Sequence, residues 1–179
     1  LGMILYSLLL IGFPFGIFFG LQADPSLEHL TYLGYYFVIL STIGLYNLYQ
    51  NFKNKNIRRT LFWNISGWIV MTLLFFYSLY PQVDAENPVQ KLLPQIDSEQ
   101  KIISYSRLNP AFVFALEREI PRYPSIEEIQ EIVETYRSGY VISRTNYLDE
   151  LSQIPGLEYH AEAKDLFETP TTLVMKWSR

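Results

Sequence analysis

The chain has 179 residues, of which 49% are apolar, 16% aromatic and 18% charged, with a formal net charge of −4. The absence of cysteine excludes disulfides, thiol nucleophiles and thiolate metal sites. Two histidines, His29 and His160, are too few and too far apart for a histidine metal site, and the acidic balance argues against nucleic-acid partners.

The charges divide the chain into two unlike halves. Residues 1–80 hold six charged side chains, which are Asp24, Glu28, Lys53, Lys55, Arg58 and Arg59. Residues 81–179 hold all the others and carry the whole net negative charge. The first half is therefore typical of a membrane protein, and the second half of a water-soluble domain.

Three uncharged, mostly apolar runs fill the first half, at residues 1–21, 30–49 and 61–80. Each has about the ~20 residues that a helix needs to cross the hydrocarbon core of a bilayer. The first run lacks the basic start and small-residue exit of a cleaved signal peptide. The sequence thus predicts three membrane-spanning helices at residues 1–80, and no catalytic residue in them.

The loops between these runs predict an orientation. The loop between the second and third runs carries four basic residues at positions 53–59, whereas the first loop carries only Asp24 and Glu28. Basic loops are retained in the cytoplasm. With three spans, everything after residue 80 is then expected on the extracytoplasmic side.

The first run contains small residues and a proline. Gly12, Gly16 and Gly20 make two overlapping GxxxG patterns, which indicate either a helix-packing face or simply the high glycine content of spanning helices. Pro14 is expected to kink the helix. No Asp, Glu, Lys or Arg lies inside the three runs, which argues against a free-standing transporter or channel.

In the second half, residues 81–100 read as a connector and residues 101–179 as a small α/β domain. Strands are expected at 101–106, 140–143, 158–163 and 171–177, with an extended piece at 120–123. Helices are expected at 111–119, at 125–138 and from an Asn146 cap to residue 154. This order predicts a layered α/β domain with a mixed sheet, partly parallel with an antiparallel end.

The clearest helix starts at a capping box formed by Ser125 and Glu128. Its apolar stripe is expected to comprise Ile126, Ile129, Val133 and Tyr136, and Gly139 is expected to end it. The glutamates of this helix are read as a solvated face and not as a metal site.

One binding site is expected from sheet geometry. Ligands of open α/β sheets bind beyond the carboxyl ends of the strands. Arg107 and Asn109 follow the first predicted strand and Arg144 ends the later one, so these three residues are candidates for holding a phosphate or carboxylate. Ordinary exposed turn residues are the alternative explanation. No catalytic residue and no metal ligand is assigned.

Aromatic-rich spans followed by an α/β tail resemble the C-terminal part of bacterial membrane glycosyltransferases of the GT-C fold, the relatives of protein O-mannosyltransferases and aminoarabinose transferases. The segments that carry the resemblance are KIISYSRLNPAFVFALEREIP (101–121), SIEEIQEIVETYRSGYVIS (125–143), YLDEL (147–151) and EYHAEAKDLFETPTTLVMKW (158–177). Within the first segment, Pro110 to Ile120 fit the pattern P-x-x-x-F-x-L-x-R-E-I.

The resemblance implies transfer of a sugar from a polyprenyl-phosphate donor to a lipid, glycan or protein acceptor, on the outer face of the bacterial inner membrane. The implied partners are the bilayer, the lipid-linked donor and an upstream transmembrane bundle of the same protein. The family's acidic catalytic residues, and the ligands of any divalent metal, match nothing in this chain, so the fragment alone is expected to be inactive.

A different class of function fits the same residues. Three spans before a compact α/β domain also suit a membrane-anchored extracytoplasmic interaction or sensor domain without catalysis.

Overall fold

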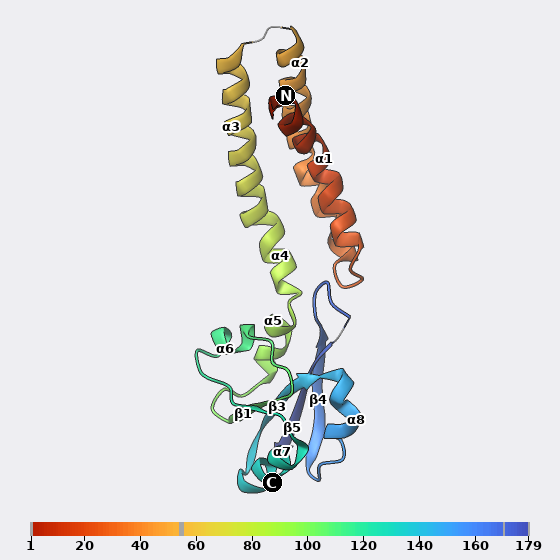
Figure 1. The fold of residues 1–179 in the computed structure, drawn as a ribbon, viewed down its shortest axis with the longest axis vertical. Helices are drawn as coiled ribbons and strands as arrows, with labels where there is room; N and C mark the ends of the chain where they lie inside the picture. Colours follow the sequence, from red (N-terminus) through yellow and green to blue (C-terminus); the bar gives the residue numbers. More distant parts are fainter. Residues whose placement is uncertain (1, 54–55, 170, 179) are drawn as a thin grey trace. The chain divides into compact units, whose positions relative to one another are not determined.

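The computed structural model describes residues 2–53, 56–169 and 171–178 (Figure 1). Predictions that concern Leu1, Lys55, Pro170 and Arg179 lie outside the described residues. The chain divides into a helical unit that ends at Asp84 and a second unit that begins at Ala85. Each unit is described by itself.

The helical unit contains α1 (Gly2–Gln22), η1 (Glu28–Phe37, a 3-10 helix), α2 (Val38–Lys53), α3 (Ile57–Leu74), η2 (Phe75–Leu79, one π turn) and all but the last residue of α4 (Tyr80–Ala85). The last three join into one helix of 29 residues, Ile57–Ala85. By length and composition, α1 and this joined helix can cross a membrane.

The prediction of three spans is wrong in number, because the described residues contain two such helices. The second predicted span, 30–49, begins as the 3-10 helix η1 and becomes α-helical only at Val38. The α-helical part has 16 residues, about 24 Å at ~1.5 Å per residue, which is short of the ~30 Å hydrocarbon core. An uncharged run of apolar residues does not show where the backbone changes from 3-10 to α-helical hydrogen bonding. The prediction that the second half lies on the extracytoplasmic side depends on three crossings, and it stays a prediction.

Glycines of the second helical stretch, and not those of α1, make the close helix contact. A Cβ atom on Gly44 would lie 2.6 Å from the backbone oxygen of Ser7, and one on Gly34 would lie 3.1 Å from that of Pro14. Around Gly12, Gly16 and Gly20, no described atom beyond the chain neighbours and the backbone of α1 itself lies within 4 Å of a Cβ position. Within the described chain, the GxxxG face of α1 therefore has no helix packed on it.

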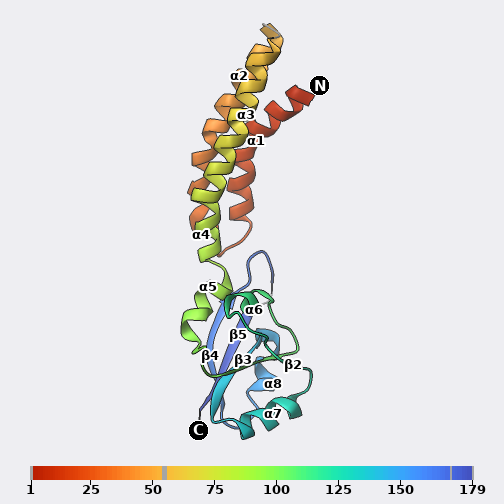
Figure 2. The same ribbon diagram turned by 90° about the vertical axis from the view of Figure 1, so that its left-hand side faces the viewer.

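Pro14 lies in the middle of α1, which bends along its length (Figure 2). Proline has no N–H to donate to the carbonyl of Leu10, so the helix opens at this turn. The Ser41 hydroxyl of α2 donates a hydrogen bond of 2.9 Å to the carbonyl oxygen of Ile11 in the same turn. The serine thus binds the carbonyl next to the one that the proline leaves without its helical donor, and it ties the two helices together at this turn.

Replacement of Gly44 tests the close contact. Gly44→Ala should destabilise the helical unit by about 1–3 kcal/mol, because the new methyl group meets the backbone of α1. Gly16→Ala is the matched control: its methyl group meets no described atom, so the helix should be unchanged or slightly stabilised. Thermal unfolding of the chain in detergent micelles, followed by far-ultraviolet circular dichroism, measures both. Equal midpoints for the two variants would contradict the contact.

The second unit is built on a mixed five-stranded sheet, as the sequence predicts. Its strands are β1 (Lys101–Tyr105), β2 (Arg122–Tyr123), β3 (Ser138–Arg144), β4 (Leu157–Lys164) and β5 (Thr171–Ser178), in the order β2-β1-β3-β5-β4. The β1 strand pairs in parallel with β2 and β3, and β5 pairs antiparallel with β3 and β4. The parallel part and the antiparallel end are both confirmed.

Short helices cover both faces of this sheet. They are α5 (Pro88–Leu92), η3 (Leu93–Gln95), α6 (Ala111–Ala115), α7 (Ile126–Thr135), η4 (Thr145–Tyr147) and α8 (Leu148–Leu151). Alternate residues of β1 and β3 face opposite sides, as strand geometry requires. Ile102 and Ile142 join one core with α5 and α6, whereas Ile103 and Val141 join another with α7 and α8. The unit therefore has three layers (Figure 2). Residues 88–96, which the sequence places in a connector, pack into the first core.

The helix α7 begins at the predicted cap, where the Ser125 hydroxyl accepts a hydrogen bond from the Glu128 N–H. Ile129 and Val133 of the predicted stripe are buried. The prediction for Tyr136 is wrong: the helix ends at Thr135 and the tyrosine ring is exposed. The backbone at Tyr136 is extended, and the Tyr136 carbonyl oxygen accepts a hydrogen bond from the indole N–H of Trp177 in the last strand of the chain.

Two further local predictions are wrong. Gly139 lies inside β3 and does not end the preceding helix; a Cβ atom there would lie 2.4 Å from both the Lys101 oxygen and the Trp177 ring. The glycine is needed for this close approach and not for a helix end. Asn146 is exposed within η4 and does not cap a helix, because the turn closes in 3-10 geometry before α8 begins.

Candidate functional site

A small polar pocket lies in the second unit, where β3 ends. It has a volume of about 220 Å³ and is lined by Asn87, Pro88, Leu108, Asn109, Pro110, Arg144, Asp165, Leu166 and Glu168. These residues come from the start of α5, the loop after β1, the end of β3 and the turn between β4 and β5. We call it the Asp165 pocket.

Asp165 is the most buried polar group of this pocket, with only 6% of its surface exposed. Its Oδ1 accepts a hydrogen bond of 2.7 Å from the Thr172 hydroxyl. Its Oδ2 is buried, and within the described part of the chain it accepts no hydrogen bond. A buried polar atom without a partner is costly, so this oxygen marks a position where a donor is needed.

Burial raises the pKa of Asp165 above its ordinary value. The hydrogen bond from Thr172 and the positive charge of Arg144 act in the opposite direction, and the negative charge of Glu168 adds to the rise. The net direction is upward because removing a carboxylate from water outweighs one hydroxyl donor and one nearby guanidinium.

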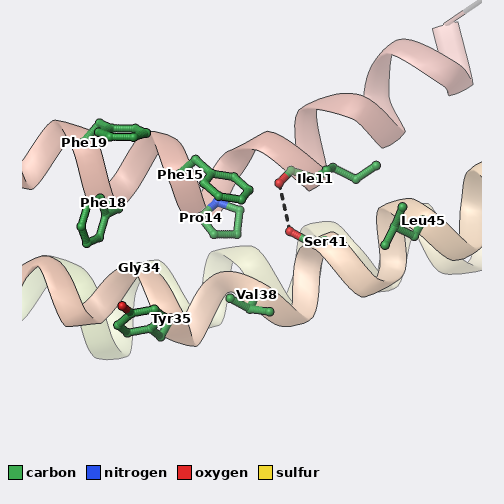
Figure 3. A pocket seen from close by; sticks show the side chains of 10 residues that line it. All are labelled: Ile11, Pro14, Phe15, Phe18, Phe19, Gly34, Tyr35, Val38, Ser41 and Leu45. Atoms are coloured by element: carbon green, nitrogen blue, oxygen red, sulfur yellow. Dashed lines mark hydrogen bonds between the residues drawn. The ribbon is translucent and has the colours of Figure 1, made fainter.

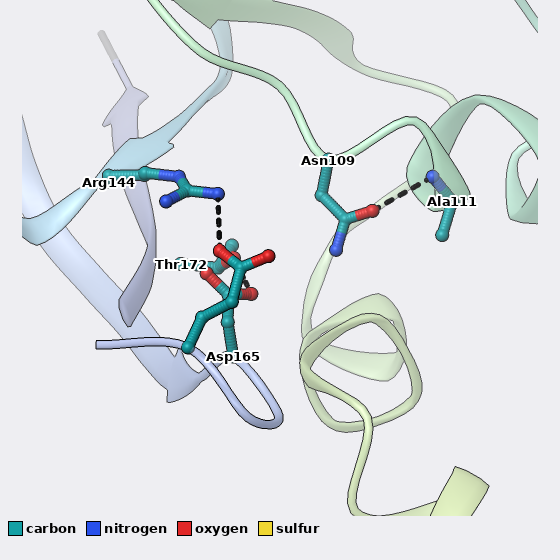
Figure 4. Close-up of polar contacts among 6 residues, drawn as sticks. Asn109, Ala111, Arg144, Asp165 and Thr172 are labelled. Carbon is teal, nitrogen blue, oxygen red and sulfur yellow. Dashed lines mark hydrogen bonds and ion pairs between the residues drawn. The ribbon is translucent and has the colours of Figure 1, made fainter. Parts of the chain in front are cut away.

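Arg144 and Glu168 form an ion pair across the mouth of the pocket. Nη2 of Arg144 lies 3.0 Å from Oε2 of Glu168, and the glutamate side chain is 54% exposed. Figure 4 shows the Arg144 guanidinium beside Asp165 and Thr172, facing Asn109 across the pocket. An exposed pair of this kind contributes little stability.

Asn109 forms the opposite wall. Its Oδ1 accepts a hydrogen bond of 3.0 Å from the N–H of Ala111, the first residue of α6. Figure 4 shows the oxygen turned toward Ala111 and the amide nitrogen turned away from it. The side-chain oxygen is therefore used by the helix start, whereas the nitrogen remains able to donate.

The structure brings together two of the three candidate residues from the sequence. Asn109 and Arg144 line the same pocket, while Arg107 is exposed and does not line it. Sequence reasoning missed Asp165 and Glu168. Their signal was weak: two acidic residues in a turn between strands are usually solvated, and only the pairing of β3 with β5 brings that turn beside Arg144. A ligand for these residues stays a prediction.

No metal centre is found among the described residues, which contain no group of three or more His, Asp or Glu side chains able to hold an ion. His160 has a structural contact instead, since its Nε2 lies 2.9 Å from the carbonyl oxygen of Gln95 and its ring packs beside Tyr140.

A second, apolar pocket of about 560 Å³ lies in the helical unit, between α1 and the stretch formed by η1 and α2 (Figure 3). It is lined by Ile11, Pro14, Phe15, Phe18, Phe19, Gly34, Tyr35, Val38, Ser41 and Leu45. The only hydrogen bond drawn among them, from Ser41 to Ile11, is internal to the helix pair. Apart from the hydroxyls of Tyr35 and Ser41, this lining is apolar and suits hydrocarbon.

Comparison with known proteins gives one structural relative to describe. No protein-family model matches the sequence, and no curated protein matches it. The chain is similar to the crystal structure of ArnT from Cupriavidus metallidurans in the apo state, with a TM-score of 0.61 and 9% sequence identity. The similarity covers 97% of this chain and 36% of the ArnT chain.

This similarity extends over both units, since it covers nearly the whole chain. At 9% identity it shows a shared fold. The chain spans about a third of the length of ArnT, which is a GT-C glycosyltransferase. The resemblance stated from the sequence is therefore supported at the level of the fold.

The raised pKa of Asp165 predicts a pH-dependent effect of its replacement. Because the folded pKa is above the unfolded value of 3.8, Asp165 stabilises the fold at low pH, and this contribution is lost as the pH rises through the folded pKa. Asp165→Asn keeps an oxygen for Thr172 but cannot ionise. Its stability relative to the unmodified protein should thus increase from pH 4 to pH 7.

Fluorescence of Trp177 measures this effect during urea unfolding of the full chain in micelles. Trp177 is buried in the second unit, and replacing Trp63 and Trp68 by Phe leaves it as the only tryptophan of the three. Glu131→Gln, which removes an exposed carboxylate of α7, is the control for loss of one charge. A relative stability of Asp165→Asn that falls between pH 4 and pH 7 would contradict the upward shift.

Proposed function

We propose that this chain is the C-terminal portion of an integral membrane glycosyltransferase. The enzyme transfers a sugar from a polyprenyl-phosphate donor to a lipid, glycan or protein acceptor on the outer face of the membrane. The observation that carries the proposal is the likeness to ArnT, a GT-C aminoarabinose transferase, over 97% of this chain. Because the likeness covers both the helices and the sheet, it supports the proposal more strongly than a likeness of the α/β domain alone would.

The helical unit supports a place in the bilayer. Its two membrane-length helices expose many large apolar side chains, among them Leu8, Phe15, Phe19, Ile65, Trp68 and Phe76. Water would penalise such a surface, whereas lipid tails or further helices would cover it without cost. The proposed location is the bacterial inner membrane, with the second unit on the extracytoplasmic side.

The proposed role of this portion is to complete the transmembrane bundle. In this proposal, the base that activates an acceptor hydroxyl and the ligands of any divalent metal belong to the upstream part of the protein. The open glycine face of α1 suits the upstream helices as packing partners, since absent side chains allow backbones to approach closely. The apolar pocket suits the hydrocarbon of lipids or of the polyprenyl chain.

The native protein tests this proposal directly. An antibody against residues 100–179 isolates it from its source membrane, and intact mass spectrometry should give a mass well above the 21.0 kDa of this chain. Membrane vesicles that contain the protein should transfer radiolabelled sugar from a polyprenyl-phosphate donor to membrane acceptors. Vesicles from a deletion strain should lack this transfer, and the 179-residue chain alone should not restore it.

Either of two results would reject the transferase. One is a native mass near 21.0 kDa, which leaves no room for a catalytic bundle. The other is unchanged sugar transfer in the deletion strain across the donors tested. The membrane-anchored interaction domain would then be the better description of the chain.

A further inference from the structure

The Asp165 pocket is lined by two residues with hydrogen-bonding atoms of opposite kind that have no partner among the described residues. Oδ2 of Asp165 is buried and accepts no hydrogen bond from the described residues, so it needs a donor. The amide nitrogen of Asn109 can donate to an acceptor, because only the amide oxygen is used by the start of α6. A ligand that uses both groups donates to one wall of the pocket and accepts from the other.

The charges of the pocket exclude simple ions as the best fit. A phosphate or other anion would accept from Asn109 and Arg144, but it would meet the oxygens of Asp165 and Glu168. A metal or ammonium cation would suit the carboxylates, but it would meet the guanidinium of Arg144 and the N–H groups of Asn109. A hydroxyl both donates and accepts, so hydroxyl groups suit both walls.

The size and the rest of the lining limit the ligand further. The pocket volume of about 220 Å³ exceeds the ~30 Å³ that one water occupies, and it is smaller than the ~300 Å³ at which sites for drug-sized ligands begin. Pro88, Leu108, Pro110 and Leu166 add apolar surface beside the polar groups. A sugar ring presents hydroxyls at its edge and C–H groups on its faces, which matches this mixture.

We propose that the Asp165 pocket binds a single neutral sugar residue, whose hydroxyls donate to Oδ2 of Asp165 and accept from the amide nitrogen of Asn109. Arg144, held by Glu168, is a second donor beside them. The sugar is either free or the end of a larger glycan or glycolipid, since the pocket recognises the ring and its hydroxyls. The proposal rests on the groups of this pocket and does not require the transferase function.

Saturation-transfer-difference NMR on the full chain in lipid nanodiscs tests the proposal. The probes are D-glucose, D-galactose, D-mannose, D-xylose and N-acetyl-D-glucosamine, each titrated to saturation, with calcium chloride and inorganic phosphate titrated by calorimetry. At least one sugar should bind saturably. If none binds to the folded chain, the proposal is overturned, and water alone satisfies Asp165.

Two conservative variants test whether the sugar binds in the Asp165 pocket. Asp165→Asn keeps an acceptor for Thr172 and loses the free carboxylate oxygen; Asn109→Asp keeps an acceptor for the Ala111 N–H and loses the amide donor. Each should weaken sugar binding about tenfold, the effect of one hydrogen bond. Asn146→Asp, at an exposed position, is the matched control for added charge and should leave binding unchanged.

The Asn109→Asp variant also separates a sugar from a cation. Adding a carboxylate beside Asp165 and Glu168 should weaken the binding of a sugar but strengthen that of calcium. Calcium binding that increases in this variant, without sugar binding in the unmodified chain, would overturn the proposal in favour of a cation site. Sugar binding that neither variant changes would place the sugar elsewhere and overturn it too.

A competition experiment with a glycan polymer that carries the same terminal sugar distinguishes a free sugar from the end of a glycan as the ligand. If the polymer competes at a lower concentration of terminal sugar than the free monosaccharide does, the pocket recognises the end of a glycan. Competition by the monosaccharide alone supports a free sugar as the ligand. Both results support the pocket as a sugar site. Because no transfer is measured, the outcome is independent of whether the protein is a transferase.

Discussion

The antiparallel pairing of β3 with β5 is the constraint on which the second unit depends. Its register places Gly139 opposite Trp177 at one end and Arg144 opposite Thr172 at the other. At the first end, the missing side chain of the glycine admits the indole ring that fills the core. At the second end, Thr172 holds Asp165 beside Arg144 and so creates the pocket. A slip by one residue would turn every side chain of the strand to the other face and remove both arrangements.

The helical unit obeys a different constraint: many of its large apolar side chains are exposed, although Leu10, Phe37 and Leu40 are buried, and small residues allow its closest backbone contacts. Gly34 and Gly44 allow α1 to approach the second helical stretch, and Ser41 donates to the turn that Pro14 opens. In the proposed bilayer location, close contacts of this kind between small groups would help to hold the helices together. The proposed transferase would use the remaining open face of α1 to join the rest of its bundle.

The two proposals assign different tasks to the two units. Chemistry is assigned to an upstream part of the proposed enzyme, and this chain supplies helices for the bundle and a domain with its own small pocket. In the Asp165 pocket, a carboxyl oxygen is kept out of water without a protein donor, which raises the pKa of Asp165. Natural domains bear such a cost where a ligand repays it, so a binding role for the second unit fits its energetics.

Patterns of local origin were determined by the sequence alone: the membrane-like first half, the capping box at Ser125, the strand periodicity and the mixed sheet. Each depends on spacing along the chain, which the residues state directly. The tertiary structure decided what depends on partners distant in sequence. It broke the second apolar run into 3-10 and α-helical parts, moved Gly139 into a strand beneath Trp177, and brought Asp165 to Arg144. The physical reason is that register and packing bring residues together across the fold, and no local period encodes which distant side chain fills a given space.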